Sequence, residues 1–195
     1  MVSILRLGVV LITAILTGCH SGQPVFEATD ITGAEFGKGF SLTDHTGKQR
    51  TLQDFHGKVV VVFFGFTHCP DVCPTTLAEL SRAIKNLGPA GKQVQVLMVT
   101  VDPGRDTPEV LGEYVTAFNP QFLALRGTAD ETSRVAKEFK VIFQKVAGPT
   151  PQNYSMDHSA GTYIFDRQGR LRLYVAYGRG ADVFTHDIDL LLKQP

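Results

Sequence analysis

An uninterrupted apolar run followed by two cysteines constrains the fold of this chain more than any other feature. The run, Val59 to Phe64, contains only valine and phenylalanine and ends at Gly65. Because polar residues do not alternate with the apolar ones, it predicts a strand buried on both faces, as in parallel sheets covered by helices. Cys69 and Cys73 follow, and a proline comes directly after each of them.

The two prolines indicate where the cysteines lie relative to the next helix. Pro70 disfavours the helical conformation at Cys69, whereas Pro74 suits the first position of a helix. We therefore expect Cys69 in the loop after a central strand and Cys73 at the start of the following helix. This end of an α/β sheet carries functional sites, and the helix dipole there favours thiolate over thiol. Two thiolates held close together can form a disulfide or bind a soft metal ion.

Buried strands and amphipathic helices alternate along the rest of the chain. Alternating elements of this kind predict a partly parallel sheet with helices on both faces. Together with a redox-type cysteine pair after a central strand, they predict an α/β, thioredoxin-like fold with an N-terminal β-hairpin and insertions. A flavodoxin-like sheet fits less well, because the pattern closes with an antiparallel hairpin. The predicted elements are strands at 94–101, 122–125 and 141–146, helices at 74–87, 108–118, 129–139 and 182–192, hairpins at 40–52 and 162–175, and a loop at 148–153.

The N-terminus has the pattern of a bacterial lipoprotein signal. An apolar run at 7–16 follows Arg6 and has about half of the roughly 20 residues needed to span a bilayer. It ends in Leu16-Thr17-Gly18-Cys19, which resembles a lipobox and predicts a signal peptide at 1–18 with lipid on Cys19. An uncleaved anchor and an ordinary signal peptide are the alternatives. We interpret residues 19–37 as a tether and residues 38–195 as one folded domain.

The number of cysteines indicates the cellular compartment, and the net charge indicates which class of partner is not expected. Of three cysteines, lipidation of Cys19 leaves one pair, Cys69 and Cys73, which suits a disulfide-permissive compartment outside the cytoplasm. The chain has 19 basic and 19 acidic residues and no net charge, so no nucleic-acid partner is expected, since that would need a basic face.

Three kinds of chemistry compete for the cysteine pair. A thioredoxin-type dithiol oxidoreductase usually has two residues between its cysteines, and this chain has three, Pro70-Asp71-Val72. A peroxiredoxin site needs a threonine three residues before its cysteine, and Pro70 stands there instead. A copper site is the third possibility, because Cu(I) prefers thiolates and an imidazole ligand serves both oxidation states.

A third ligand would distinguish copper binding from dithiol exchange. His158 is the candidate, because it lies in the segment that enters the strand predicted at 162–165. In thioredoxin-like folds this segment packs against the cysteine loop. His68 adjoins Cys69, but neighbours in an extended loop point in opposite directions. Position alone leaves a structural role for His158 open.

Three separate motifs follow one another along the chain. They are the stretch from Phe63 to Leu77, then Val101-Asp102-Pro103 with Arg105-Asp106-Thr107-Pro108, and then Asp157-His158-Ser159. Motifs of this kind and in this order resemble those of the Sco/SenC family of copper chaperones, and the resemblance covers about residue 36 to the C-terminus. It implies a thioredoxin-like fold in which Cys69, Cys73 and His158 bind copper, as Cu(I) or Cu(II).

The resemblance also implies a membrane-tethered protein that helps to assemble the binuclear copper site of cytochrome c oxidase. Members of the family deliver copper to that site, reduce the target's cysteines, or both. The expected partner is therefore the copper-bearing oxidase subunit or another copper protein. In this chain a lipobox replaces the transmembrane helix of many members, which predicts a lipid-anchored protein on the periplasmic side of a bacterial membrane. We do not expect a turnover enzyme; the alternative is a thiol–disulfide oxidoreductase that uses the same cysteines without metal.

Four further residues receive weaker interpretations. Asp71, between the cysteines, is expected to tune the thiolates, orient a partner or cap the helix. Asp157 is expected either to hydrogen-bond His158 and orient it or to form a turn. Arg105 and Asp106 predict an ion pair within a loop, without a chemical role.

Overall fold

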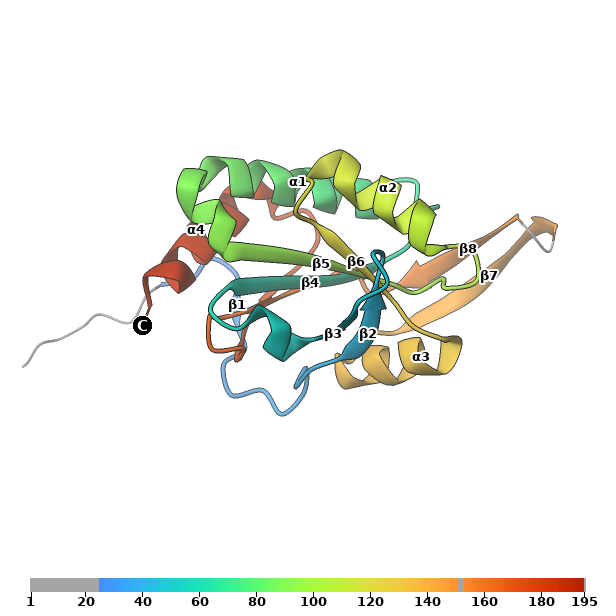
Figure 1. Ribbon diagram of the computed structural model, residues 1–195, viewed down its shortest axis with the longest axis horizontal. Coiled ribbons are helices and arrows are strands. Elements are labelled where there is room, and N and C mark those ends of the chain that lie inside the picture. The colour runs from blue at the N-terminus through green and yellow to red at the C-terminus, as the bar shows by residue number, and fades with distance from the viewer. Residues whose placement is uncertain (1–24, 151–152, 195) are drawn as a thin grey trace, which may run out of the picture.

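An eight-stranded sheet forms the centre of the protein in the computed structural model, which describes residues 25–150 and 153–194 (Figure 1). Across the sheet, the strands are β1 (Thr29–Asp30), β10 (Leu171–Val175), β9 (Thr162–Phe165), β4 (Val59–Gly65), β5 (Val94–Thr100), β6 (Leu123–Arg126), β2 (Ser41–Asp44) and β3 (Gln49–Thr51). β4, β5 and β6 are parallel to one another, and the other neighbouring pairs are antiparallel. This mixed sheet and both predicted hairpins agree with the architecture expected from the sequence.

β4 lies in the middle of the sheet and carries the apolar run. All seven of its residues are buried, because β5 and β9 pair with its two edges and packed elements cover both of its faces. The prediction of a strand buried on both sides is therefore confirmed. Gly65 is the last residue of β4, and the chain leaves the sheet there toward the two cysteines.

Helices cover both faces of the sheet. α1 (Val72–Asn86), α2 (Pro108–Phe118) and α4 (Gly180–Lys193) lie on one face, and α3 (Ala129–Glu138) lies on the other (Figure 1). Two short 3₁₀ helices, Leu52–Phe55 and Gly88–Gln93, complete the helical elements of the described residues. α2 begins as predicted, with Pro108 at its first position and the Thr107 side chain accepting a hydrogen bond from the Val110 amide. α1 begins two residues before Pro74, so Cys73 already lies in its first turn.

A two-stranded hairpin projects from the domain and forms a sheet of its own (Figure 1). Its strands are β7 (Phe143–Thr150) and β8 (Asn153–His158), paired with Phe143 opposite His158. The sequence predicted a shorter first strand followed by a loop, and it missed β8. The reason is that most residues of this hairpin are exposed, so its sequence lacks the apolar pattern of a core strand.

The N-terminal segment contacts the domain from Phe26 onward, whereas the sequence predicted a folded domain from residue 38. β1 pairs with β10, and the backbone amides of Glu27 and Ala28 donate to the buried Asp187 carboxylate at 2.9 and 2.8 Å. Phe26, Ala28, Ile31, Ala34 and Phe36 pack against the core. Much of the predicted tether therefore belongs to the folded unit. The predicted signal peptide and Cys19 lie outside the described residues.

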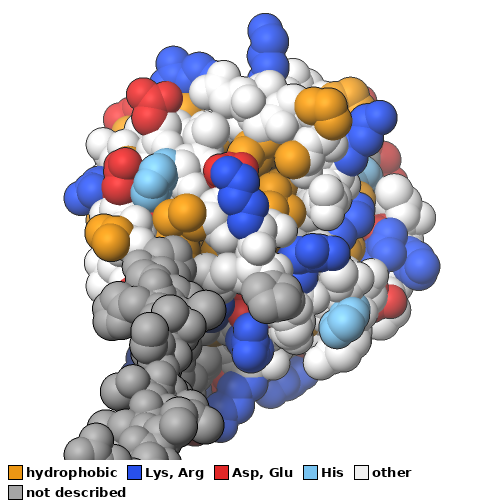
Figure 2. All heavy atoms as spheres, turned by 90° about the vertical axis from the view of Figure 1, so that its left-hand side faces the viewer, with side chains coloured by type: hydrophobic (Ala, Val, Ile, Leu, Met, Phe, Trp, Pro, Cys, Tyr) orange, Lys and Arg blue, Asp and Glu red, His pale blue; other side chains and the backbone are white. Residues whose placement is uncertain are grey.

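Charged side chains of both signs cover the end of the molecule at which β1 and the C-terminus lie (Figure 2). Hydrophobic side chains form small groups between them on this face. In the part of the chain that the structure describes, no helix combines the length and the apolar character needed to cross a membrane.

Candidate metal centre

Gly65 and the first turn of α1 together place the cysteine sulfurs. Cys73 is buried in that turn, whereas Cys69, in the preceding loop, is half-buried. A β-carbon on Gly65 would lie 2.7 Å from the Cys73 sulfur, closer than the two atoms can approach. Glycine at the end of β4 therefore leaves the space that this sulfur occupies. The Cys73 amide donates to the Cys69 sulfur at 3.5 Å, and this bond holds the Cys69 sulfur near that of Cys73.

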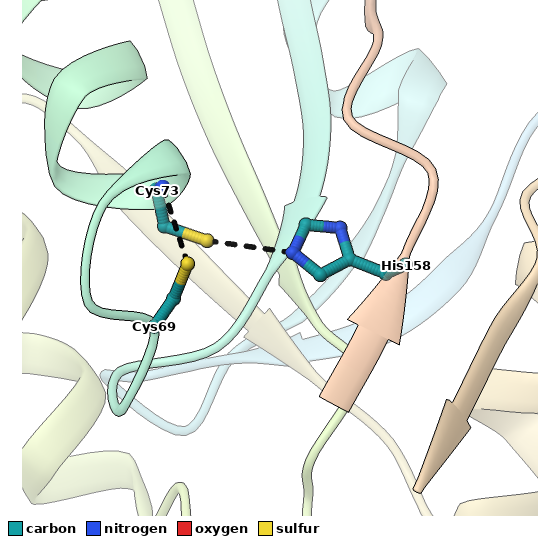
Figure 3. A group of neighbouring side chains, drawn as sticks. All are labelled: Cys69, Cys73 and His158. Atoms are coloured by element: carbon teal, nitrogen blue, oxygen red, sulfur yellow. Dashed lines mark hydrogen bonds between the residues drawn. The ribbon is translucent and has the colours of Figure 1, made fainter. Parts of the chain in front are cut away.

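His158, the last residue of β8, faces the cysteines (Figure 3). Its Nε2 atom lies 3.6 Å from the Cys73 sulfur, and its Nδ1 atom lies 3.0 Å from the carbonyl oxygen of Ser159. The Phe66 ring meets the imidazole edge-on, with ring centroids 5.9 Å apart. Because a carbonyl can only accept, Nδ1 carries the proton and donates to it. The lone pair on Nε2 then faces the sulfurs, as a metal ligand requires.

Cys69, Cys73 and His158 form a set of donors suited to copper. One donor atom from each lies within 4.8 Å of the other two. A first-row metal ion binds sulfur at about 2.3 Å and imidazole nitrogen at about 2.0 Å, so one ion fits among atoms at this spacing. The set has three donors, one fewer than a structural zinc site uses. Two thiolates favour Cu(I), and the imidazole adds a ligand that Cu(II) also accepts.

The two thiols differ in acidity. A hydrogen bond from the Cys73 thiol lowers the pKa of Cys69 to about 5, against the opposing effect of burial and with help from the amides of Asp71 and Cys73. The same hydrogen bond, together with burial, raises the pKa of Cys73 above its ordinary value. In the metal-free protein at neutral pH, Cys69 is therefore the thiolate and Cys73 the thiol.

The three other side chains that the sequence placed near the site contribute less. Asp71 occupies the N-cap position of α1 without a side-chain bond to the helix amides; it accepts from the Thr75 hydroxyl at 3.3 Å. Asp157 is exposed, and of its two proposed roles the bond to His158 is absent at Nδ1, where the Ser159 carbonyl lies instead. His68 is exposed, and its Nδ1 lies 3.1 Å from the Thr67 hydroxyl rather than near the sulfurs.

The predicted ion pair between Arg105 and Asp106 is wrong. Arg105 pairs with Asp102, at 2.5 Å between Nε and Oδ2. The fully buried Asp106 instead accepts hydrogen bonds from the amide and the hydroxyl of Thr67, at 3.2 and 2.6 Å. Sequence reasoning marked this loop but missed these contacts, because Asp106 and Thr67 are 39 positions apart.

Known proteins resemble this chain in sequence over most of its length. The SCO1/SenC family model matches residues 28–193. The mitochondrial SCO2 homolog of Bos taurus is 37% identical over 158 residues, which cover 80% of this chain and 59% of the bovine protein. The chain thus spans less than two thirds of the length of that relative.

Solved structures with the same fold include one with copper bound. Bradyrhizobium japonicum ScoI with copper bound is 36% identical, with a TM-score of 0.72 over 82% of this chain and 100% of that one. Apo Sco1 of Thermus thermophilus is 40% identical, with a TM-score of 0.77 over 86% of this chain and 98% of that one. These similarities confirm the predicted thioredoxin-like fold.

Proposed function

The chain belongs to the SCO1/SenC family, and on this premise we propose that it binds copper through Cys69, Cys73 and His158. We further propose that it serves the assembly of cytochrome c oxidase, by delivering copper to the binuclear copper site, by reducing the cysteines of that site, or by both. The observation that carries the proposal is the convergence of two sulfurs and one imidazole nitrogen within 4.8 Å. Copper bound to the similar ScoI protein supports it.

The unequal exposure of the donors fits transfer to a partner. Cys73 is buried on α1, and His158 is fixed at the end of a strand by the Ser159 carbonyl and the Phe66 ring. Cys69 lies in a loop and is half-buried, so it is the sulfur of the two that an approaching thiolate of a partner reaches first. Copper, as the cargo, can then pass between sulfur ligands without unfolding of the domain.

A second function for the same cysteines is thiol–disulfide exchange without metal, and the unequal pKa values favour it. The Cys69 thiolate would attack one sulfur of a target disulfide and release the other target sulfur as a thiolate. Cys73 would then lose its proton and attack the Cys69 sulfur. The products are a Cys69–Cys73 disulfide and a target with two reduced cysteines, so two electrons pass to the target.

Two measurements test the copper function directly. The purified domain should retain stoichiometric copper through dialysis, and a strain lacking the gene should lose oxidase activity until the wild-type chain is restored. Copper binding without any effect on the oxidase would redirect the proposal to another copper protein as partner. Failure to retain copper, with restored oxidase activity, would favour dithiol exchange.

We also propose that lipid on Cys19 anchors the protein outside the cytoplasm. The support is the lipobox-like sequence that precedes this cysteine. It agrees with the use of a reactive cysteine pair, which needs a compartment where disulfides can persist.

A further inference from the structure

We propose that the loop between β5 and α2, residues 101–107, acts as a bracket that holds the cysteine segment and the histidine strand at copper-binding distance. Asp106 holds the cysteine side, and Asp102 with Arg105 hold the histidine side through Tyr154 of β8. All four are positioning residues, because none of their atoms belongs to the donor set. The inference rests on the proposed copper function, and it assigns a role to a loop that otherwise takes no part in it.

The need for such a bracket follows from the topology. The cysteines follow β4 of the eight-stranded sheet, whereas His158 ends β8 of the separate two-stranded sheet. Among the residues that the structure describes, β8 forms strand pairs with β7 alone. The central sheet restrains His158 only through Thr162, four residues later, which pairs with Phe63 of β4. The exact position of the imidazole relative to the sulfurs therefore depends on contacts between side chains.

The cysteine side of the bracket is the Asp106 carboxylate. It is fully buried and accepts from the amide and the hydroxyl of Thr67, two residues before Cys69. It also accepts from the hydroxyl of Thr100, the last residue of β5. Hydroxyls and one amide thus satisfy this carboxylate, and they attach the start of the cysteine loop to the end of β5.

The histidine side is a stacked and hydrogen-bonded Tyr154. Its hydroxyl donates to Asp102 at 2.7 Å, and its carbonyl accepts from Nη1 of Arg105 at 2.9 Å. The Arg105 guanidinium carbon lies 3.6 Å from the centroid of the Tyr154 ring and 6.0 Å from that of Phe66. Phe66 in turn contacts the His158 imidazole. Arg105 therefore touches both the strand that carries His158 and the ring that orients it.

A tight turn joins the two sides. The amides of Arg105 and Asp106 both donate to the Asp102 carbonyl, at 3.2 and 3.0 Å, and the Asp102 amide donates to the Thr100 hydroxyl at 3.0 Å. Because the turn bonds to itself, a displacement of Tyr154 relative to Thr67 must break at least one of these bonds. The loop thereby couples the position of the imidazole to that of the sulfurs.

The test uses one variant for each side of the bracket and a matched control. Tyr154→Leu removes the ring and the hydroxyl on the histidine side, Tyr154→Phe removes the hydroxyl alone, and Thr67→Val removes one bond on the cysteine side. Asp166→Asn is the control: Asp166 is a buried carboxylate that pairs with Arg170 and Arg172 beyond the far end of β9. Two signals are measured. The first is the thiolate-to-Cu(II) absorption, whose titration gives the affinity for Cu(II), and the second is the set of NMR resonances of the His158 ring in the metal-free protein.

We expect Tyr154→Leu to weaken Cu(II) binding by about 10- to 100-fold, the usual effect of removing a group that orients a metal ligand. It should shift the His158 ring resonances while leaving Cu(I) retention and thiol titration unchanged. Tyr154→Phe should have a smaller effect of the same kind, because the ring stays on Arg105. Thr67→Val should change the rate of Cys69–Cys73 disulfide formation and leave the His158 resonances in place. Asp166→Asn should change neither signal.

The proposal would be overturned if folded Tyr154→Leu kept the wild-type absorption, Cu(II) affinity and His158 resonances. It would also be overturned if Asp166→Asn showed the changes expected of Tyr154→Leu. If Tyr154→Leu does not fold, Tyr154→Phe decides, and wild-type values of both signals in that variant overturn the bracket. If the wild-type chain itself binds no copper, the proposed function fails. The His158 resonances of the metal-free variants then still decide the bracket.

Discussion

The Nε2 atom of His158 lies 3.6 Å from the Cys73 sulfur, although 85 positions separate these residues in the sequence. The contact joins the first turn of α1 to the end of β8. One partner supplies a sulfur and the other an imidazole. Substitution of Cys73 and substitution of His158 are therefore expected to affect copper binding and thiol chemistry in different ways.

Each cysteine is expected to be indispensable for tight copper binding. Cys69→Ala or Cys73→Ala leaves one thiolate and one imidazole, which hold Cu(I) poorly. Copper should no longer remain with either variant through purification and dialysis. Circular dichroism serves as the control for folding, because Cys73 is buried and its truncation opens a small cavity. A folded single variant that still retains stoichiometric copper would exclude the site.

His158→Ala is expected to abolish Cu(II) binding and to leave Cu(I) binding in place. Cu(II) needs the imidazole, so the thiolate-to-Cu(II) absorption should disappear, whereas Cu(I) persists on two thiolates. Thiol titration and disulfide formation should continue, because His158 contributes no sulfur. The variant should fail to support oxidase assembly. Wild-type Cu(II) binding together with full complementation would make His158 a structural residue and leave dithiol exchange as the function.

Cys19→Ser tests the anchor. The variant should lack lipid and should not undergo normal lipoprotein processing, which mass spectrometry of the membrane fraction detects. Cys69 and Cys73 are unchanged in this variant, so copper binding by the purified chain is the control and should be normal. Unaltered membrane association, with no difference in mass that lipid explains, would identify the apolar run at 7–16 as the anchor itself.

Gly65→Ala should displace the Cys73 sulfur. The added β-carbon would lie 2.7 Å from that sulfur, so we expect a loss of about 1–3 kcal/mol in the free energy of unfolding. Copper affinity should fall as well. The matched control is Gly65→Ala in a Cys73→Ala background, where the sulfur is absent and the same substitution should destabilise the fold much less. Equal effects of Gly65→Ala in the two backgrounds, measured by denaturant unfolding, would contradict this account.

Asp44 should make stability depend on acid pH, independently of the metal centre. Burial alone would raise the pKa of Asp44, but hydrogen bonds from the Thr46 hydroxyl, the Arg50 guanidinium and the backbone amides of Lys48 and Thr46 lower it to about 2 from 3.8. The folded-state pKa lies below the unfolded value, so the stabilisation is present above about pH 4 and is lost as the pH falls toward 2.

Asp44→Asn should therefore lower the free energy of unfolding at pH 7 by about 2 kcal/mol. The difference between the variant and the wild type should shrink between about pH 4 and pH 2, where the wild-type carboxylate also becomes neutral. Denaturant unfolding across this range, with reductant present, measures it. A difference that stays constant with pH would mean that the charge of Asp44 does not stabilise the fold.

Local patterns were sufficient to predict the central part of the fold. β4 and α1 followed from an apolar run, two prolines and helical periodicity, so Cys69 and Cys73 could be placed before the structure was known. β8 was missed because only one of its six residues, Met156, is buried and its apolar pattern is weak. The folded N-terminal segment was missed because its core contacts, such as Phe26 and Phe36, are scattered among glycine, threonine and charged residues.

The rest of the site depends on contacts between distant residues. His158 could be named as a candidate, but its partner at Nδ1 is a backbone carbonyl, and an oxygen common to every residue leaves no mark in a sequence. The Arg105–Asp106 pair was predicted from adjacency. Adjacent residues in a turn point in different directions, and Asp106 is directed toward Thr67 instead.

The oxidised pair and a copper-bound site would enclose very different lengths of chain, although both use the same cysteines. A Cys69–Cys73 disulfide links residues four positions apart, whereas an ion bound to both Cys73 and His158 links residues 85 positions apart. Loop-closure entropy grows with the length of the enclosed chain, so by the relation used for disulfides the short link restricts the unfolded chain by about 2 kcal/mol and the long one by about 4–5 kcal/mol. A copper ion bound to Cys73 and His158 would thus close a loop of chain that contains α1, α2, α3 and two of the three parallel strands, β5 and β6, whereas a Cys69–Cys73 disulfide would not.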